Sequence, residues 1–393
     1  MRSYIVGGAV RDELLGLPVQ DHDHVVVGAT PEEMMAAGYT PVGKDFPVFL
    51  HPSTHEEYAL ARTERKTAPG YKGFVFHADE NVTLEQDLVR RDLTINAMAK
   101  AEDGSIIDPF NGRRDLQQRI FRHVSDAFAE DPVRILRLAR FAARFTDFRV
   151  APETHALMRR MAEEGEVDAL VPERVWQEIS RGLMEARPSR MIEVLRDCGA
   201  LARILPELAA LWRMPASAPQ AAAGARLLCM LDDAAQAGLD LPQRFAVLTY
   251  DLSAGAVSPQ EDAAAALVDA VCKRIKVPTD CRDLARITAR EHRHVARAGT
   301  LSAEDKVALF ERCDAFRKPQ RFIDMLQAAA CIHGGAQAAF PQRDDLTSAL
   351  EAARGVDAGA VARQLAERVK EIPGAVHRAR VAAVEAVAAQ RQR

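Results

Sequence analysis

Apolar residues in the first part of the chain come in short runs that are bounded by glycine, proline and aspartate. Runs of this kind are typical of β-strands, which are short and enriched in branched and aromatic side chains. The stretches between them fit short helices. Up to about residue 110 the pattern therefore predicts mixed strands and helices, with strands at residues 4–6, 25–28, 46–50 and 57–62.

Beyond about residue 112 the apolar positions recur at helical spacing, with alanine-rich stretches such as residues 263–266. Prolines mark helix ends in this part, at positions 188, 206, 278 and 319. Residues 215–224 are the best candidate for a loop within it. The expected fold class is α+β: a small head with a mixed β-sheet and helices, followed by an all-helical extension.

Composition limits the possible functions. The chain has 393 residues, too many for one compact core, so two to four domains or lobes are expected. Its formal net charge of −4 means that any surface for nucleic acid must be locally basic. No run approaches the roughly 18 apolar residues of a membrane span, and the expected location is cytoplasmic. The six scattered cysteines are expected to be reduced core residues.

Two groups near the N-terminus point to nucleotide chemistry. Gly7 and Gly8 follow the first predicted strand and open a helix that carries Arg11, which suits a phosphate-binding turn. Asp21 and Asp23, placed on one strand, point to the same face and can share divalent cations such as Mg²⁺. Each feature alone has a plainer interpretation, a tight turn and a solvated strand edge. Together they predict nucleotidyl transfer.

Five motifs in a fixed order extend this picture. They are Ile-Val-Gly-Gly-Ala-Val-Arg-Asp with the following Asp-x-Asp, Arg-Arg-Asp-Leu-Thr-Ile-Asn-Ala, Asp-Pro-Phe-Asn-Gly, Glu-Asp-Pro-Val-Arg and Pro-Glu-Arg-Val-Trp, at residues 5–23, 90–97, 108–112, 130–134 and 172–176. In this order they resemble the class II tRNA nucleotidyltransferases, which comprise the CCA-adding enzymes and bacterial poly(A) polymerases. The resemblance is strong through about residue 210.

The resemblance implies a head, neck, body and tail. We expect a nucleotidyltransferase head at residues 1–115, a helical neck with a base-reading helix at 116–190, a body at 191–300 and a tRNA-binding tail at 301–393. It also implies Mg²⁺ as the cofactor, CTP and ATP as substrates and the tRNA 3′ end as the partner. A monomer or weak homodimer is expected.

A row of arginines forms the centre of the predicted nucleotide site. Arg134, Arg137, Arg140 and Arg144 fall within a sector of about 120° on one helix. Without context, such a stripe is usually a solvated face or an ion-pair lattice. Together with Asp21 and Asp23 as metal ligands, the residues expected to bind nucleotide, mostly by resemblance, are Gly8, Arg11, Arg91, Asp92, Asn96, Asp131, Arg134, Arg137 and Arg140.

The roles within this set differ. By resemblance, Arg91, Arg137 and Arg140 bind phosphates, and Asp131 and Arg134 read the base. Asn96, in a helix-like segment at residues 93–99, could reach a ribose or phosphate oxygen. An arginine and an aspartate complement both cytosine and adenine, each of which shows a ring-nitrogen acceptor beside an amino donor. Uracil and guanine present the opposite pattern, so the protein itself could select C and A without a template.

Two further features in the head have two interpretations each. Glu64 is a candidate third carboxylate, although a surface salt bridge explains it equally well. Residues 63–73 are polar and basic and contain Pro69 and Gly70, which predicts a mobile loop between strands. They resemble the family's flexible loop, which is implicated in changing nucleotide choice; the alternative is an ordinary exposed loop.

The helical body departs from many bacterial relatives, which carry a metal-dependent phosphohydrolase of the His-Asp type. Tyr250 stands before Asp251, where that dyad needs histidine, and no histidine lies between His155 and His292. The metal ligands cannot be assembled here, so no phosphohydrolase activity is expected. Asp251 is expected to be a helix cap or surface residue, and His292 and His294 to be exposed helix residues.

The sequence therefore predicts a CCA-adding tRNA nucleotidyltransferase. One alternative is a poly(A) polymerase of the same family, which usually carries a longer, basic C-terminal extension. Others are enzymes that add only CC or only A. A catalytically silent RNA-binding protein is a further alternative, which the intact Asp21 and Asp23 disfavour.

Overall fold

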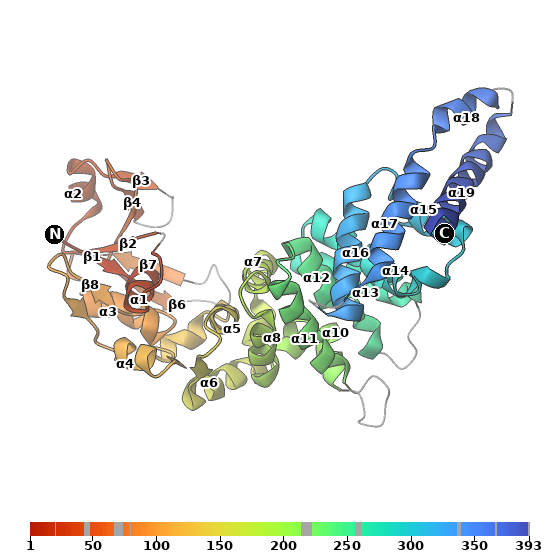
Figure 1. Cartoon of the computed structure of the whole chain (residues 1–393). Helices are drawn as coiled ribbons and strands as arrows, with labels where there is room; N and C mark the ends of the chain where they lie inside the picture. Colours follow the sequence, from red (N-terminus) through yellow and green to blue (C-terminus); the bar gives the residue numbers. More distant parts are fainter. Residues whose placement is uncertain are drawn as a thin grey trace. The chain divides into compact units, whose positions relative to one another are not determined.

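The computed structural model describes residues 1–19, 21–42, 48–66, 74–78, 80–213, 222–255, 261–335, 339–365 and 368–391. Contacts divide it into two units, Met1–Glu178 with Arg190–Ile204, and Ile179–Ser189 with Leu205–Arg393. All described strands belong to the first unit, and the second is helical, which confirms the α+β expectation (Figure 1). The finer division into head, neck, body and tail stays a prediction.

The strands of the first unit are β1 (Arg2–Val6), β2 (Asp23–Val27), β3 (Thr40–Val42), β4 (Val48–Leu50), β5 (Glu57–Leu60), β6 (Arg62–Lys66), β7 (Phe74–Ala78), β8 (Ala99–Lys100), β9 (Ile106–Ile107), β10 (Ile120–Phe121) and β11 (Arg149–Val150). Its helices are α1 (Gly8–Leu14), α2 (Pro31–Ala36), α3 (Leu84–Val89), α4 (Gly112–Gln117), α5 (Val133–Arg144), α6 (Pro152–Glu163) and α9 (Ala200–Ile204). Helices α7 (Pro172–Leu183) and α8 (Pro188–Asp197) have residues in both units.

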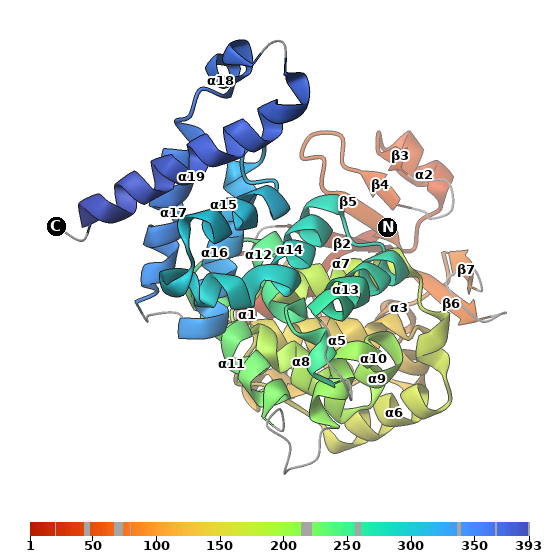
Figure 2. The same cartoon turned by 90° about the vertical axis from the view of Figure 1, so that its right-hand side faces the viewer.

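The second unit contains α10 (Pro206–Ala209), α11 (Ala223–Gln236), α12 (Leu241–Thr249), α13 (Glu261–Ile275), α14 (Thr279–Ala296), α15 (Ala303–Arg312), α16 (Pro319–Gly334), α17 (Pro341–Arg354), α18 (Ala358–Gln364) and α19 (Ile372–Arg391). Helix α12 packs against α11, α14 and α16, while α19 packs against α15, α17 and α18, as Figure 2 shows for α18 and α19. None of the described helices is long and apolar enough to cross a membrane.

The main sheet of the first unit is mixed and has seven strands, in the order β3-β4-β5-β2-β1-β8-β9. Among the described residues, its only parallel pair is β2 with β5, which places Asp23 opposite Glu57. Val25 and Val26 are buried on opposite faces of β2, in two different apolar clusters. Because successive strand residues alternate in direction, apolar neighbours of this kind require cover on both faces of the sheet. Asp23, the first residue of β2, is thus held in place by the pairing of β2 with both neighbouring strands.

Several predicted boundaries need correction. The run at residues 57–62 is broken, since β5 ends at Leu60 and β6 begins at Arg62. Residues 46 and 47 of the predicted strand, and residues 67–73 and 215–221 of the two predicted loops, lie outside the described residues. The start of the first predicted loop belongs to β6, and the end of the second belongs to α11. The prolines at 188, 206 and 319 lie in the first turn of α8, α10 and α16, and Pro278 directly precedes α14. Proline suits this place because the first-turn N–H has no partner within the helix.

The Asp-Pro-Phe-Asn-Gly motif has a structural explanation. Asp108 accepts hydrogen bonds from the backbone N–H groups of Gly112 and Arg113, at 2.7 and 2.9 Å, and so caps the start of α4. Asn111 has a φ of 62°, which asparagine tolerates better than most residues. A Cβ atom on Gly112 would lie 2.3 Å from the carbonyl oxygen of Thr94. The glycine of the motif therefore allows α4 to pack closely against the 3₁₀ helix Thr94–Asn96.

The Gly112→Ala substitution is expected to destabilise the protein by about 1–3 kcal/mol, because the new methyl group meets backbone, which cannot rotate away. Thermal or denaturant unfolding measures this loss. Gly299→Ala is the matched control, since a Cβ there meets nothing within 4 Å. Equal stability of the two variants would show that α4 does not depend on this close approach.

Candidate active site

An open cavity of about 770 Å³ lies in the first unit. It is bounded by strands β1, β2 and β5, by the N-terminus of α1, by residues 90–96, by α5 and by the first turn of α7. Nine arginines and five carboxylates line it. This excess of cations suits an anionic ligand, because clefts lined by one sign of charge concentrate the opposite sign. The residues concerned are Arg11, Arg62, Arg90, Arg91, Arg134, Arg137, Arg140, Arg144 and Arg174, with Asp21, Asp23, Glu57, Asp92 and Asp131.

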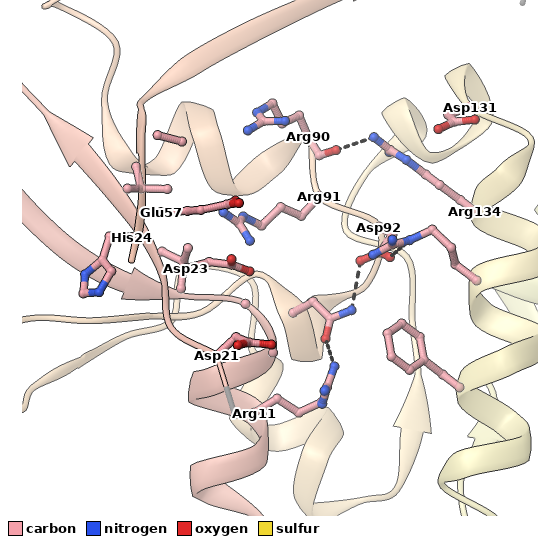
Figure 3. A pocket seen from close by; sticks show the side chains of 18 of the residues that line it. Arg11, Asp21, Asp23, His24, Glu57, Arg90, Arg91, Asp92, Asp131 and Arg134 are labelled. Atoms are coloured by element: carbon pink, nitrogen blue, oxygen red, sulfur yellow. Dashed lines mark hydrogen bonds and ion pairs between the residues drawn. The ribbon is translucent and has the colours of Figure 1, made fainter. Parts of the chain in front are cut away.

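The carboxylates of Asp21 and Asp23 both line this cavity, as predicted, but only Asp23 belongs to a strand. Asp21 precedes β2, so strand alternation does not explain why both face the cavity. Glu57 joins them, because the parallel pairing of β2 with β5 puts it opposite Asp23. Figure 3 shows the carboxylates of Asp23 and Glu57 beside the guanidinium of Arg91 and the carboxylate of Asp21 farther from it, while the ring of His24 points away. Both aspartates are exposed and hence accessible to a ligand.

No three His, Cys, Asp or Glu side chains come together closely enough to hold a metal in the described parts of the chain. The donor set here is thus two aspartate carboxylates beside a cavity rich in arginine. Such a sparse set fits Mg²⁺, which keeps several waters and takes further oxygen ligands from substrate phosphates. It does not fit a structural zinc site, which needs four protein ligands.

The double glycine forms the predicted turn between β1 and α1. Gly7 has a φ of 72°, a conformation that glycine adopts without strain. A Cβ atom at Gly7 would lie 2.9 Å from Nη1 of Arg91, so the turn also makes room for that guanidinium. The Nε atom of Arg91 is buried and has no hydrogen-bond partner within the described residues. A buried donor of this kind beside a cavity suits an anionic ligand.

Asp92 is the centre of a hydrogen-bond network in the cavity wall. Its Oδ2 accepts from Nε of Arg137 at 2.8 Å, and its Oδ1 accepts from Nδ2 of Asn96 at 3.0 Å. Oδ1 of Asn96 accepts in turn from Nη1 of Arg11 at 2.6 Å. Burial alone would raise the pKa of Asp92, but Arg137 and Asn96 together hold it far below its usual value. Asp92 therefore stays ionised and fixes Arg137 and Asn96.

Arg11 continues this network toward α5. Its Nε donates to Asp12 at 2.8 Å, and Arg144 donates to the other oxygen of Asp12 at 2.9 Å. The Arg11 guanidinium also lies 5.0 and 5.1 Å from the ring centres of Phe141 and Phe145, within range of cation–π attraction. Burial lowers the pKa of Arg11, although Asp12 opposes that effect. The first-turn arginine is thus more strongly fixed than the sequence suggested.

Helix α5 presents its four arginines to the cavity as predicted, but most of them are paired. Arg137 binds Asp92, Arg140 binds Glu178 at 2.6 Å and Arg144 binds Asp12. The stripe is therefore both a cavity wall and an ion-pair lattice, two interpretations that the sequence treated as alternatives. The half-exposed Arg137, with 39% of its side-chain surface accessible, is the most open of the three.

Asp131 and Arg134 are three residues apart, a spacing that predicts one shared helical face, and the structure corrects this prediction. Asp131 precedes α5 and has extended backbone angles, so the two residues do not share a helical face. Arg134 donates to the carbonyl oxygen of Ala127 at 2.9 Å and to that of Arg90 at 2.6 Å, the second of which is drawn in Figure 3. Asp131 accepts two hydrogen bonds from Arg174, at 3.2 and 2.9 Å. Both residues nevertheless line the same cavity.

Sequence reasoning missed Glu57 and the role of Arg174. The position of Glu57 follows from the register between β2 and β5, for which the sequence contains no local signal. Arg174 lies in the recognised Pro-Glu-Arg-Val-Trp motif, but its partner Asp131 is 43 residues away. The side chain of Glu64, the predicted third carboxylate, lies outside the described residues. The predicted helical segment at residues 93–99 is only the 3₁₀ turn Thr94–Asn96 followed by β8.

The region of the second unit around Tyr250 and Asp251, where relatives carry the His-Asp dyad, differs from the prediction at His292. His292 is buried, with 4% of its surface exposed, so the prediction of an exposed residue was wrong. Its Nδ1 lies 3.1 Å from Nε2 of His333, and Tyr250 packs edge-on against its ring. Burial lowers the pKa of His292 to about 3, and the neighbouring His333 adds to the effect. Asp251 is half-buried, directly precedes the 3₁₀ helix Leu252–Gly255, and accepts a hydrogen bond from the hydroxyl of Ser253 at 3.3 Å.

The cysteines conform to expectation with one exception. Five of the six are buried and none is in a disulfide, whereas Cys229 on α11 is exposed. Burial raises the pKa of the Cys272, Cys281 and Cys313 thiols to about 12. These thiols are therefore inert core groups.

Two family models match parts of the chain. The family model described as "Poly A polymerase head domain" matches residues 3–122, and the model described as "Probable RNA and SrmB- binding site of polymerase A" matches residues 147–211. The first match contains both aspartates and the Arg-Arg-Asp segment. The two matches together leave most of the second unit unassigned.

Relatives cover that part as well. A "Multifunctional CCA protein" of Janthinobacterium sp. (strain Marseille) is 63% identical over 405 residues, which cover 98% of this chain and 97% of the relative. A protein of the same name from Herminiimonas arsenicoxydans is 62% identical, with the same shares covered. The CCA-adding enzyme of Bacillus stearothermophilus, solved in complex with CTP, is 25% identical with a TM-score of 0.66, over 96% of this chain and 88% of that one. The chain thus belongs to the class II CCA-adding tRNA nucleotidyltransferases.

Proposed function

We propose that the cavity of the first unit transfers CMP and AMP from CTP and ATP to the 3′ end of tRNA, with release of pyrophosphate. The observation that carries this proposal is the meeting of two exposed carboxylates with nine arginines in one cavity. In the reaction, the 3′-hydroxyl of the RNA attacks the α-phosphorus and the bond to the pyrophosphate oxygen breaks. We also propose that the reaction takes place in the cytoplasm and that the enzyme is a monomer or a weak homodimer.

Asp21 and Asp23 would hold Mg²⁺ in this scheme, and Glu57 lines the same cavity, opposite Asp23. Bound Mg²⁺ would supply a Lewis acid for the attacking hydroxyl and for the departing pyrophosphate. The protein's own contribution is to place both aspartates in the cavity wall, where their exposed side chains are accessible to a cation and to the phosphates of a nucleotide.

The arginines divide into two groups in this proposal. Arg91, with its buried and unpartnered Nε, and the half-exposed Arg137 bind the triphosphate, and Arg140 supports them. A second group is joined by hydrogen bonds from Arg11 to Asn96 and from Asn96 to Asp92. In this proposal the group forms the cavity wall near the turn at Gly8 and contacts the ribose as well as the phosphates. Such preorganised donors stabilise developing charge without reorganising during the reaction.

Asp131 and Arg134 read the base in this scheme. Arg174 holds both carboxylate oxygens of Asp131, which fixes the carboxylate that accepts from the amino group of cytosine or adenine. Arg134 donates to two backbone carbonyls, and each of its Nη atoms carries two hydrogens. A bond to a carbonyl therefore does not use up its capacity to donate to N3 of cytosine or N1 of adenine.

Three tRNA transcripts separate full CCA addition from its alternatives. Purified protein would be given transcripts that end at the base before CCA, at the first C and at the second C, with CTP and ATP alone and together. Full CCA addition predicts that every transcript is completed to CCA when both nucleotides are present. An enzyme specific for CC would leave the third transcript unchanged, and one specific for A would extend only the third. Long A tails from ATP alone would indicate a poly(A) polymerase, which the family model of the head also fits.

The second unit is expected to lack metal-dependent phosphohydrolase activity. Tyr250 replaces the histidine of the dyad, and the buried His292 is engaged with His333 and the Tyr250 ring. Hydrolysis of 2′,3′-cyclic AMP should therefore stay at background with added Ni²⁺ or Mg²⁺. Metal-stimulated hydrolysis that is lost in Asp251→Ala would show that a working site exists here, as the name of the multifunctional relatives leaves open.

A further inference from the structure

Asp87, on α3, has no role in the reaction described so far, yet it is among the least exposed charged residues of the chain. Its side chain is 1% accessible, whereas those of its partners Arg90 and Arg91 are 18% and 20% accessible. A buried carboxylate is costly unless it is fully paired. Both carboxylate oxygens of Asp87 accept hydrogen bonds, and every donor is a residue that lines the cavity.

Oδ1 of Asp87 accepts from Nε and Nη2 of Arg90, at 3.2 and 2.7 Å. The same oxygen accepts from the backbone N–H of Arg62 at 3.3 Å, and Oδ2 accepts from Nη2 of Arg91 at 3.3 Å. Arg62 begins β6, so one carboxylate joins three residues of the cavity wall, contributed by β6 and by the turn after α3. Burial would raise the pKa of Asp87, but Arg90 and Arg91 hold it below its usual value.

Arg91 is thereby held from two sides. Asp87 holds its Nη2, and the turn at Gly7 leaves room for its Nη1, which would lie 2.9 Å from a Cβ atom there. In this position the guanidinium lines the cavity, beside Asp23 and Glu57 (Figure 3). Arg90 is held by the same carboxylate, and its carbonyl oxygen accepts from Arg134.

We propose that Asp87 is a positioning residue that aims Arg91, and with it Arg90, at the triphosphate of the incoming nucleotide. The proposal rests on the nucleotidyltransferase function proposed above. Asp87 itself touches no substrate; it acts through the arginines, because a long guanidinium side chain without a fixed partner samples many rotamers. The alternative is that Asp87 only stabilises α3.

Asp87→Asn tests the proposal, since asparagine keeps the shape but loses the charge and one acceptor. We expect the KM for CTP and for ATP to rise about tenfold, with kcat within about threefold of wild type, as for loss of one charge-assisted hydrogen bond. The affinity for inorganic tripolyphosphate with Mg²⁺, measured by calorimetry, should fall by about the same factor. This probe has neither base nor ribose, so it reports the phosphate contacts alone.

Glu291→Gln is the matched control. Glu291 is also a 1% accessible carboxylate held by two arginines, Arg290 and Arg312, but it lies on α14 and does not line the cavity. We expect it to lower the melting temperature without changing tripolyphosphate affinity. An equal loss of affinity in both variants would overturn the proposal, because it would reflect general destabilisation.

A double-mutant cycle decides whether Asp87 acts through Arg91. In the Arg91→Ala background, Asp87→Asn should change tripolyphosphate affinity by less than about threefold, because the group it aims is gone. The same tenfold loss in both backgrounds would overturn the proposal. If Asp87→Asn does not fold, Asp87→Glu keeps the charge but shifts the carboxylate, and unchanged affinity in that variant would also overturn it. Tripolyphosphate binding needs no tRNA, so a wild-type protein that binds it but adds no nucleotide would contradict the proposed function alone.

Discussion

Asp21→Asn and Asp23→Asn are each expected to reduce nucleotide addition by at least about a thousandfold, because each removes a carboxylate that would hold the catalytic cation. Both side chains are exposed at the cavity edge, so folding and tRNA binding should change little. Single-turnover addition of CMP to a tRNA transcript lacking its 3′ end measures the loss of activity. Circular dichroism checks that the variants are folded, and a gel-shift assay checks that they bind tRNA.

Asp103→Asn is the control for these variants. Asp103 is an exposed aspartate of the same unit and does not line the cavity, so its substitution should leave addition unchanged. Turnover within about tenfold of wild type in Asp21→Asn or Asp23→Asn would contradict the assignment of these residues as metal ligands.

Arg134→Ala is expected to lower the preference for CTP over UTP by about a hundredfold, since a mismatched buried polar group is what rejects the wrong base. Arginine needs an acceptor at ring position 3, where uracil presents N–H. Removing the arginine removes this clash as well as the bond to cytosine. The ratio of kcat/KM for CTP and UTP, measured on a tRNA that lacks its CCA end, reports the change.

Arg137→Ala provides the comparison, because Arg137 lies on the same helix and lines the same cavity. As a phosphate ligand it should weaken CTP, ATP and UTP alike and leave the ratio near that of wild type. An unchanged ratio in Arg134→Ala would contradict base reading by this residue. An equal loss of discrimination in Arg137→Ala would mean that the base is read elsewhere.

The sequence predicted those features that depend on neighbouring residues. The glycine turn after β1, the helix α5 and its four arginines on one side were all readable, because strand ends, turns and helical faces repeat over a few residues. The sequence also predicted that Asp21 and Asp23 point to the same side, and both line one cavity. That prediction relied on the alternation of side chains along a strand, but only Asp23 belongs to a strand.

What could not be predicted depends on pairs distant in sequence. The register that puts Glu57 beside Asp23 comes from a parallel strand pair, and no short pattern encodes such a register. Asp131 pairs with Arg174, which lies 43 residues away in the sequence. His292 looked exposed because charged residues surround it in the sequence, yet the helix turns its ring toward His333.

The most direct test of the account is the sequence added to a tRNA that ends before CCA when all four nucleoside triphosphates are present at equal concentration. Selection by Asp131 and Arg134 in the arginine-lined cavity predicts that sequencing of the 3′ ends finds C, C and A, followed by a stop. Runs of A, or tails that contain U and G at levels near those of C and A, would contradict the account.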